Sequence, residues 1–107
     1  MILDLRMYTC RPGMMQNWLN LYADAGYEHQ VRHCGEPLLY ATSDVGPQNQ
    51  VVHVWRYESH ADRDEKRVAM LKDPGFARYM KLSQEMAAHQ SMENRILTPC
   101  EFKPASR

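Results

Sequence analysis

The chain has 107 residues, 44% of them hydrophobic, which suits a single domain with one core. Its 13 basic and 13 acidic residues balance. Nucleic acids and anionic membrane surfaces need an excess of Lys and Arg, so this balance argues against both as partners. No apolar run approaches the roughly 20 residues of a membrane helix, and we predict no membrane insertion.

The cysteines indicate a reducing compartment. Cys10, Cys34 and Cys100 are odd in number and widely spaced, with no C-x-x-C pair. Such spacing does not suit a disulfide framework. Asp4 and Arg6 interrupt the first apolar residues, which argues against a signal peptide. We therefore expect a cytoplasmic protein.

The first half of the chain predicts strand, helix and strand. Residues 2–10 alternate in polarity and end at the turn 11–13. Apolar side chains then recur at helical spacing through Ala25, and Gly26 weakens or kinks this helix. The helix resumes over 27–34 and stops at Gly35. A strand over 38–43 and a loop over 44–48 lead into the next strand as a hairpin.

The second half repeats the order. Residues 49–57 form a strand, Ser59 is the expected N-cap of a helix, and Asp73-Pro74 restarts a helix. Residues 90–98 form the last strand. The order β-α-β-β-α-β predicts a ferredoxin-like α+β fold, with a four-stranded antiparallel sheet and helices on one face. We place one domain over residues 1–99 and an irregular tail over 100–107.

One sheet face should be aliphatic and the other polar and aromatic, because side chains alternate along a strand. We expect Leu3, Leu5, Met7, Val52 and Val54 to lie under the helices. The bare face would then collect the remaining strand side chains: Asp4, Arg6, Tyr8, Asn49, His53, Trp55, Glu93 and Arg95. Such a face is too aromatic for water, which predicts a homodimer through the sheet face, a barrel-like dimer with a partly polar, aromatic-lined interior.

Three segments resemble the NIPSNAP family. In that family they read like E-L-R-x-Y-x-x-x-P-G, L-N-x-V-V-H-x-W-x-Y and N-x-I-L. The matching segments here are 4–13, 48–57 and 94–97, and the similarity extends over about residues 2–99. Asp4 stands where Glu is usual, and Gln48 where Leu is usual. The resemblance implies the dimeric α+β barrel fold, whose superfamily includes monooxygenases, haem-degrading enzymes and lactone isomerases, but it implies no established reaction.

His53 is the candidate catalytic residue. Imidazole titrates near neutral pH, so His53 could carry protons or ligate haem. The alternative, which we favour, is a structural histidine bonded to Asp4, Glu93 or a backbone group. The ligand-binding candidates are Arg6, Tyr8, Asn49, Trp55 and Arg95. The arginines could hold an anion or form salt bridges to Asp4 and Glu93, and the aromatic rings could wall a ligand or pack at a dimer interface.

Other polar residues carry weaker signals. His29 and His33 have the i, i+4 spacing of a metal pair but lack a placed third ligand, so we predict no metal and no cofactor. We expect residues 62–67 to be an exposed charged helix face, and His60 and His89 to be solvated.

The function hypotheses are three. The first is a homodimer that binds a small apolar or aromatic ligand, or a partner, in or near the barrel interior. The second is a monooxygenase- or isomerase-type enzyme using His53, and the third is a haem-binding protein.

Overall fold

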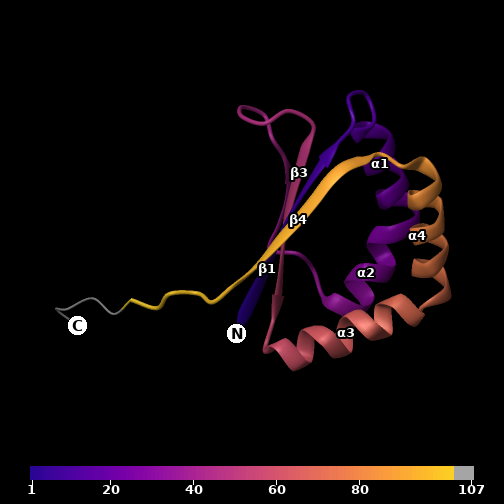
Figure 1. Ribbon diagram of the computed structural model, residues 1–107. Helices are drawn as coiled ribbons and strands as arrows, with labels where there is room; N and C mark the ends of the chain where they lie inside the picture. Colours follow the sequence, from indigo (N-terminus) through magenta and orange to yellow (C-terminus); the bar gives the residue numbers. More distant parts are fainter. Residues whose placement is uncertain (103–107) are drawn as a thin grey trace.

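A computed structural model describes residues 1–102 of the chain. The order of elements is β-α-β-β-α-β, with each helical part divided into pieces (Figure 1). The elements are β1 (Ile2–Cys10), α1 (Met15–Leu21), the π-helix η1 (Tyr22–Gly26), α2 (Tyr27–Cys34), β2 (Leu39–Thr42), β3 (Gln50–Tyr57), α3 (His60–Lys72), α4 (Pro74–Met86) and β4 (His89–Leu97). This order confirms the predicted α+β fold class.

Gly26, the last residue of η1, occupies a position where a side chain would not fit. A Cβ at this position would lie 2.9 Å from ring carbons of both Tyr22 and Tyr79. The absence of a side chain therefore lets α4 approach η1 closely. The helix continues as α2 and ends at Gly35, whose φ of 79° is left-handed and favours glycine.

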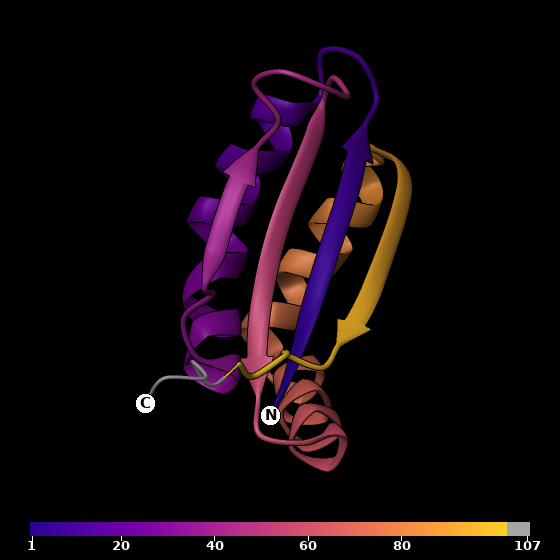
Figure 2. The ribbon, with the colours of Figure 1, turned by 90° about the vertical axis from the view of Figure 1, so that its left-hand side faces the viewer.

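The four strands form one antiparallel sheet in the order β2-β3-β1-β4 (Figure 2). All the helices lie on the same side of it, and the other side is uncovered (Figure 1). The two central strands place Leu5 opposite Val54 and Arg6 opposite His53. Residues paired in this way share a sheet face, so the register decides which side chains meet the helices.

The predicted assignment of the two faces is wrong for β1 and β3. Asp4 is 0% exposed, His53 2% and Trp55 1%, so these side chains lie beneath the helices. The aliphatic side chains point the other way and are only half-buried: Leu3, Leu5, Met7, Val52 and Val54. We call these five residues the open face.

The helices explain the inversion, because their inward side chains are largely aromatic. Trp18 is 1% exposed, Tyr22 5%, Phe76 4% and Tyr79 5%, and all four belong to the core. An aromatic helix layer accommodates the aromatic sheet face, where rings meet at angles that suit their quadrupoles. Tyr8, for example, packs edge-on against Trp18 with ring centroids 5.8 Å apart.

No helix among residues 1–102 combines the length and apolar character needed to span a bilayer. After β4 the chain has no regular structure through Phe102. Most of the predicted tail, residues 103–107, lies outside the described residues.

Candidate functional site

A pocket of about 340 Å³ lies between the sheet and the helices of one chain. Its walls come from β1, β2, β3 and β4 on the sheet side and from all the helical segments except the first turns of α3. Met92 on β4, 55% exposed, lines it as well. The volume of the pocket lies within the range found for small-molecule sites. Its principal side chains are Arg6, Tyr8, Trp18, Tyr22, Tyr40, His53, Arg67, Phe76, Tyr79 and His89.

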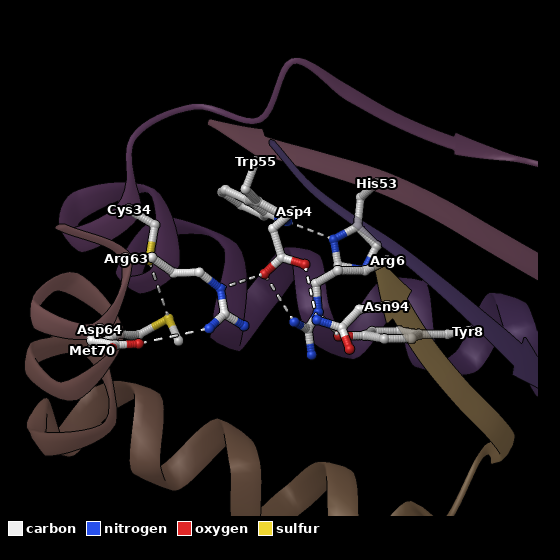
Figure 3. Close-up of polar contacts among 10 residues, drawn as sticks. All are labelled: Asp4, Arg6, Tyr8, Cys34, His53, Trp55, Arg63, Asp64, Met70 and Asn94. Carbon is white, nitrogen blue, oxygen red and sulfur yellow. Dashed lines mark hydrogen bonds and ion pairs between the residues drawn. The ribbon is translucent and has the colours of Figure 1, made fainter. Parts of the chain in front are cut away.

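His53 is held in this pocket by Trp55. The indole N–H of Trp55 donates to His53 Nδ1 over 2.6 Å, within the buried layer between sheet and helices (Figure 3). Tyr40 stacks on the imidazole with ring centroids 4.5 Å apart and an interplanar angle of 19°. Tyr8 meets it edge-on at 4.7 Å. Backbone position, one hydrogen bond and two ring contacts therefore fix the orientation of His53.

The bond from Trp55 also determines the tautomer of His53. An indole N–H can only donate, so Nδ1 must accept with its lone pair, and the proton of the neutral ring is on Nε2. Burial, followed by the charge of Arg6, lowers the pKa of His53 from 6.5 to about 3. At neutral pH the ring is therefore uncharged and presents an N–H at Nε2.

Four pocket-lining residues carry a buried polar atom without a hydrogen-bond partner among the described residues. They are Trp18 Nε1, Tyr40 Oη, His53 Nε2 and His89 Nε2. Buried polar atoms in native proteins are nearly always bonded, because leaving one unpaired costs about 1–3 kcal/mol. Four such atoms around one pocket make it the candidate functional site of the described chain.

Asp4 is the centre of a hydrogen-bonded network beside this pocket. Its carboxylate accepts from Arg6 Nη1 at 3.1 Å, Arg63 Nε at 3.0 Å and Asn94 Nδ2 at 3.2 Å (Figure 3). Burial raises the pKa of Asp4, but the bond from Asn94 and the charges of Arg6 and Arg63 outweigh it, so the pKa lies below 3.8. Asp4 is thus a buried carboxylate that joins β1, α3 and β4.

Arg6 and Tyr8 are joined to this network. Arg6 Nε donates to Tyr8 Oη over 2.8 Å while its Nη1 bonds Asp4. Both residues line the pocket. The predicted salt bridge between Arg6 and Asp4 is therefore present, and it orients the guanidinium at the pocket wall.

Three of the sequence candidates do not line the pocket. Trp55 is buried beside it and bonds His53, and the other two lie elsewhere. Arg95 is opposite Leu5 in the β1–β4 register and belongs to the open side of the sheet, whereas Arg6 is opposite Asn94. The two arginines are thus on different faces. Asn49 sits at the turn before β3 with a φ of 58°, and its carbonyl accepts from the Cys10 N–H at 2.8 Å. Asn49 therefore has a backbone role at this turn, away from the pocket.

Two pocket residues were expected to be solvated. His89 pairs with Cys10 across a bulge between Thr9 and Cys10, and the bulge turns its ring toward the helices. Its burial lowers its pKa below 6.5. Arg67, within the segment predicted to be a fully exposed charged face, also lines the pocket, and Arg63 of the same helix binds Asp4. The sequence of this helix does not indicate clearly that Arg63 and Arg67 are half-buried.

His29 and His33 meet an acidic residue. Their ring nitrogens lie 3.5 Å and 2.9 Å from Asp73 Oδ2, and Arg32 Nη1 lies 3.4 Å from the same oxygen. Asp73 also caps α4, accepting from the Gly75 N–H at 2.9 Å. Within the described chain no group of three or more potential ligands has the geometry of a metal site. The pair therefore ties α2 to the start of α4.

The chain matches the NIPSNAP family model over residues 3–104. It is 32% identical to "Protein NipSnap" of Drosophila melanogaster over 104 residues, which cover 97% of this chain and 37% of that protein. It is 30% identical to the NipSnap homolog of Dictyostelium discoideum, covering 92% of this chain and 43% of that protein. The chain thus spans less than half the length of these relatives.

Solved structures agree with this likeness. A NIPSNAP family protein from Agrobacterium tumefaciens is 35% identical, with a TM-score of 0.88 and 97% of each chain covered. A NIPSNAP-like domain protein from Burkholderia xenovorans is 32% identical, with a TM-score of 0.86, covering 96% of this chain and 88% of that one. An antibiotic biosynthesis monooxygenase, 16% identical with a TM-score of 0.64 over 94% of this chain and all of that one, shares the fold alone. This chain belongs to the NIPSNAP family.

Proposed function

We propose that this NIPSNAP protein binds a small aromatic molecule in the pocket between its sheet and its helices. The observation that carries the proposal is the set of four buried, unpartnered polar atoms around an aromatic cavity. Apolar walls with a few convergent polar groups are the usual composition of a small-molecule site. The ligand would supply the hydrogen bonds that these four atoms lack, and the rings would supply its packing.

The pocket differs in position from the expected barrel interior. His53 and Trp55 are buried beneath the helices of their own chain, and the pocket is lined by residues of that chain. Ligand binding and dimerisation are then separate properties of the protein. Each can be tested without the other.

The same geometry bears on the enzyme and haem hypotheses. Both would use the lone pair of His53 Nε2, either to take a proton or to ligate iron. The bond from Trp55 keeps the proton on Nε2, so that lone pair is not available. His53 is better suited to donate a hydrogen bond to an oxygen of the ligand. If a reaction occurs here, His53 would stabilise a developing oxyanion rather than act as the base.

The homodimer remains part of the proposal, through the open face. Leu5 and Val54 lie opposite each other at the middle of that face, and nothing in the described chain covers them. The flanking Leu39 is 48% exposed and Leu97 39%. A contiguous apolar sheet face is unusual on a monomer, and a second copy would cover it. The three free cysteines fit the reducing, cytoplasmic location that we also propose.

The test of ligand binding uses 2-naphthamide, a neutral aromatic probe, followed by ¹H–¹⁵N NMR. We expect a saturable shift of the Trp18 indole signal. Ser83→Phe places a ring at the pocket wall on α4 and should abolish the shift, whereas Ala77→Phe on the exposed side of α4 should retain it. The proposal fails if neither 2-naphthamide nor 2-naphthoate perturbs Trp18, or if both variants bind equally well.

A further inference from the structure

The unpartnered atoms of the pocket are mainly hydrogen-bond donors. Trp18 Nε1 can only donate. His53 Nε2 carries the ring proton because Trp55 occupies Nδ1, so it donates too. Trp18 is 1% exposed and His53 2%, which leaves solvent little access to either. The Tyr40 hydroxyl and His89 can act in either sense. A ligand that satisfies this set must offer acceptor oxygens.

The charge of the pocket wall has one sign. Arg6 and Arg67 both line the pocket, and no aspartate or glutamate among residues 1–102 does. Asp4 lies beside Arg6 but is shared with Arg63 and Asn94, so it offsets only part of the positive charge. Arg67 forms no ion pair with any residue in the range 1–102. Arg67 is thus a guanidinium without a carboxylate partner, and Arg6 shares its carboxylate with Arg63, so the pocket wall favours an anion.

The rings lining the pocket are arranged for a flat molecule. Four of them follow one another in nearly parallel planes, Trp18 on Tyr22 at 18°, Tyr22 on Tyr40 at 22° and Tyr40 on His53 at 19°. Centroid separations in this series are 5.4 Å, 5.2 Å and 4.5 Å. Phe76 and Tyr79 of α4 line the pocket as well, and Tyr79 meets Tyr22 edge-on. Such walls pack best against another planar ring.

We propose that the ligand is an aromatic anion, a carboxylate or a phenolate, whose ring packs among these aromatic side chains. Its oxygens accept from His53 Nε2 and Trp18 Nε1, and its charge is balanced by Arg67 and Arg6. This inference rests on the proposed function and specifies its ligand class. It also gives Trp55 a positioning role, since Trp55 holds His53 in the donating tautomer.

The experiment compares two probes that share a ring system and differ in charge. At pH 7.5 the carboxyl of 2-naphthoate is ionised, whereas 2-naphthamide is neutral and has a similar shape. Affinities are measured for both by calorimetry and by the Trp18 NMR signal. Because a charge-assisted hydrogen bond contributes about 1.5–3 kcal/mol, we expect naphthoate to bind at least about tenfold more tightly.

Two arginine variants identify the source of that preference. Arg67→Gln should reduce the ratio of naphthoate to naphthamide affinity severalfold and leave naphthamide binding intact. Arg78→Gln, on the exposed side of α4, should leave the ratio unchanged. If naphthamide binds as tightly as naphthoate, the inference of an anionic ligand is wrong and the proposed function stands. If neither probe binds, both are wrong.

Discussion

The indole N–H of Trp55 donates to His53 Nδ1 over 2.6 Å, and this bond determines what His53 can do in the pocket. A histidine in a cavity is usually first considered as a base or a metal ligand. Here Nδ1 accepts from the indole and the proton is on Nε2, so the chemistry available to Nε2 is donation. The predictions below follow from this bond and from the two faces of the sheet.

Trp55→Phe should allow the neutral His53 ring to adopt both tautomers. The phenyl ring keeps most of the packing but removes the N–H, so Nδ1 can take the proton for part of the time. We expect the ¹⁵N shifts of His53 to move from a pure Nε2–H pattern toward a mixture, while those of His89 stay unchanged. Naphthoate affinity should fall more than naphthamide affinity. An Nδ1–H tautomer in the unsubstituted protein would contradict this account.

Stability should decline on acidification through His53. Its pKa is about 3 in the folded chain, with 6.5 as the ordinary value. Between these pH values the unfolded chain binds a proton that the folded chain does not, so the free energy of unfolding falls as pH falls. The limiting slope is about 1.4 kcal/mol per pH unit.

Urea denaturation at several pH values from 7 to 4 measures this slope. His53→Gln should flatten the decline, leaving the contribution of His89, whose pKa is also lowered, and near pH 4 those of the Asp4 and Asp73 carboxylates. His60→Gln alters an exposed histidine and should leave the slope unchanged. Parallel stability curves for His53→Gln and the unsubstituted protein would show that His53 titrates normally.

Asp4→Asn should destabilise the fold strongly. Asp4 is 0% exposed and accepts from both Arg6 and Arg63, so the substitution leaves two cations without their carboxylate. Breaking a buried ion pair typically costs about 3–5 kcal/mol. Asp64→Asn removes an exposed carboxylate 3.8 Å from Arg63 and should change the free energy of unfolding by no more than about 0.5 kcal/mol. Equal effects of the two substitutions would mean that the Asp4 network contributes no stability.

Val54→Lys should separate the subunits without unfolding them. Val54 lies on β3 between Leu5 and Leu39, at the middle of the open face. In each subunit, the lysine ammonium would lose its hydration when the proposed interface forms, and this cost opposes dimerisation. Sedimentation velocity should show a dimer for the unsubstituted protein and a monomer for the variant. Val45→Lys, at a loop position that is 93% exposed, should remain dimeric. A monomeric unsubstituted protein at micromolar concentration would exclude the dimer.

The order of elements could be predicted because the polarity pattern of each element lies within a short segment of sequence. Alternation over 2–10 and 50–57, helical spacing around Trp18, and the caps at Ser59 and Asp73 all lie within short windows. The covered face of the sheet is a tertiary property and was predicted wrongly. The helices carried the information that was needed. Their aromatic core residues pack best against an aromatic sheet face, and these residues are Trp18, Tyr22, Phe76 and Tyr79.

The site was predictable in part. The alternation of side chains along β1 and β3 correctly grouped Arg6, Tyr8 and His53 on one face, and all three line the pocket. Arg95 was wrongly grouped with these residues, because parity alone does not set the register between β1 and β4. His89 was missed because a bulge reverses the side to which it points. Registers and bulges depend on partner strands, which no single segment of sequence encodes.

The central claim is that ligand binding occurs under the helices of one chain, and a structure with 2-naphthoate bound tests it most directly. We predict the naphthyl ring among Trp18, Tyr40 and Phe76, with a carboxylate oxygen accepting from His53 Nε2. A ring seated instead on the open face against Leu5 and Val54 would contradict the account.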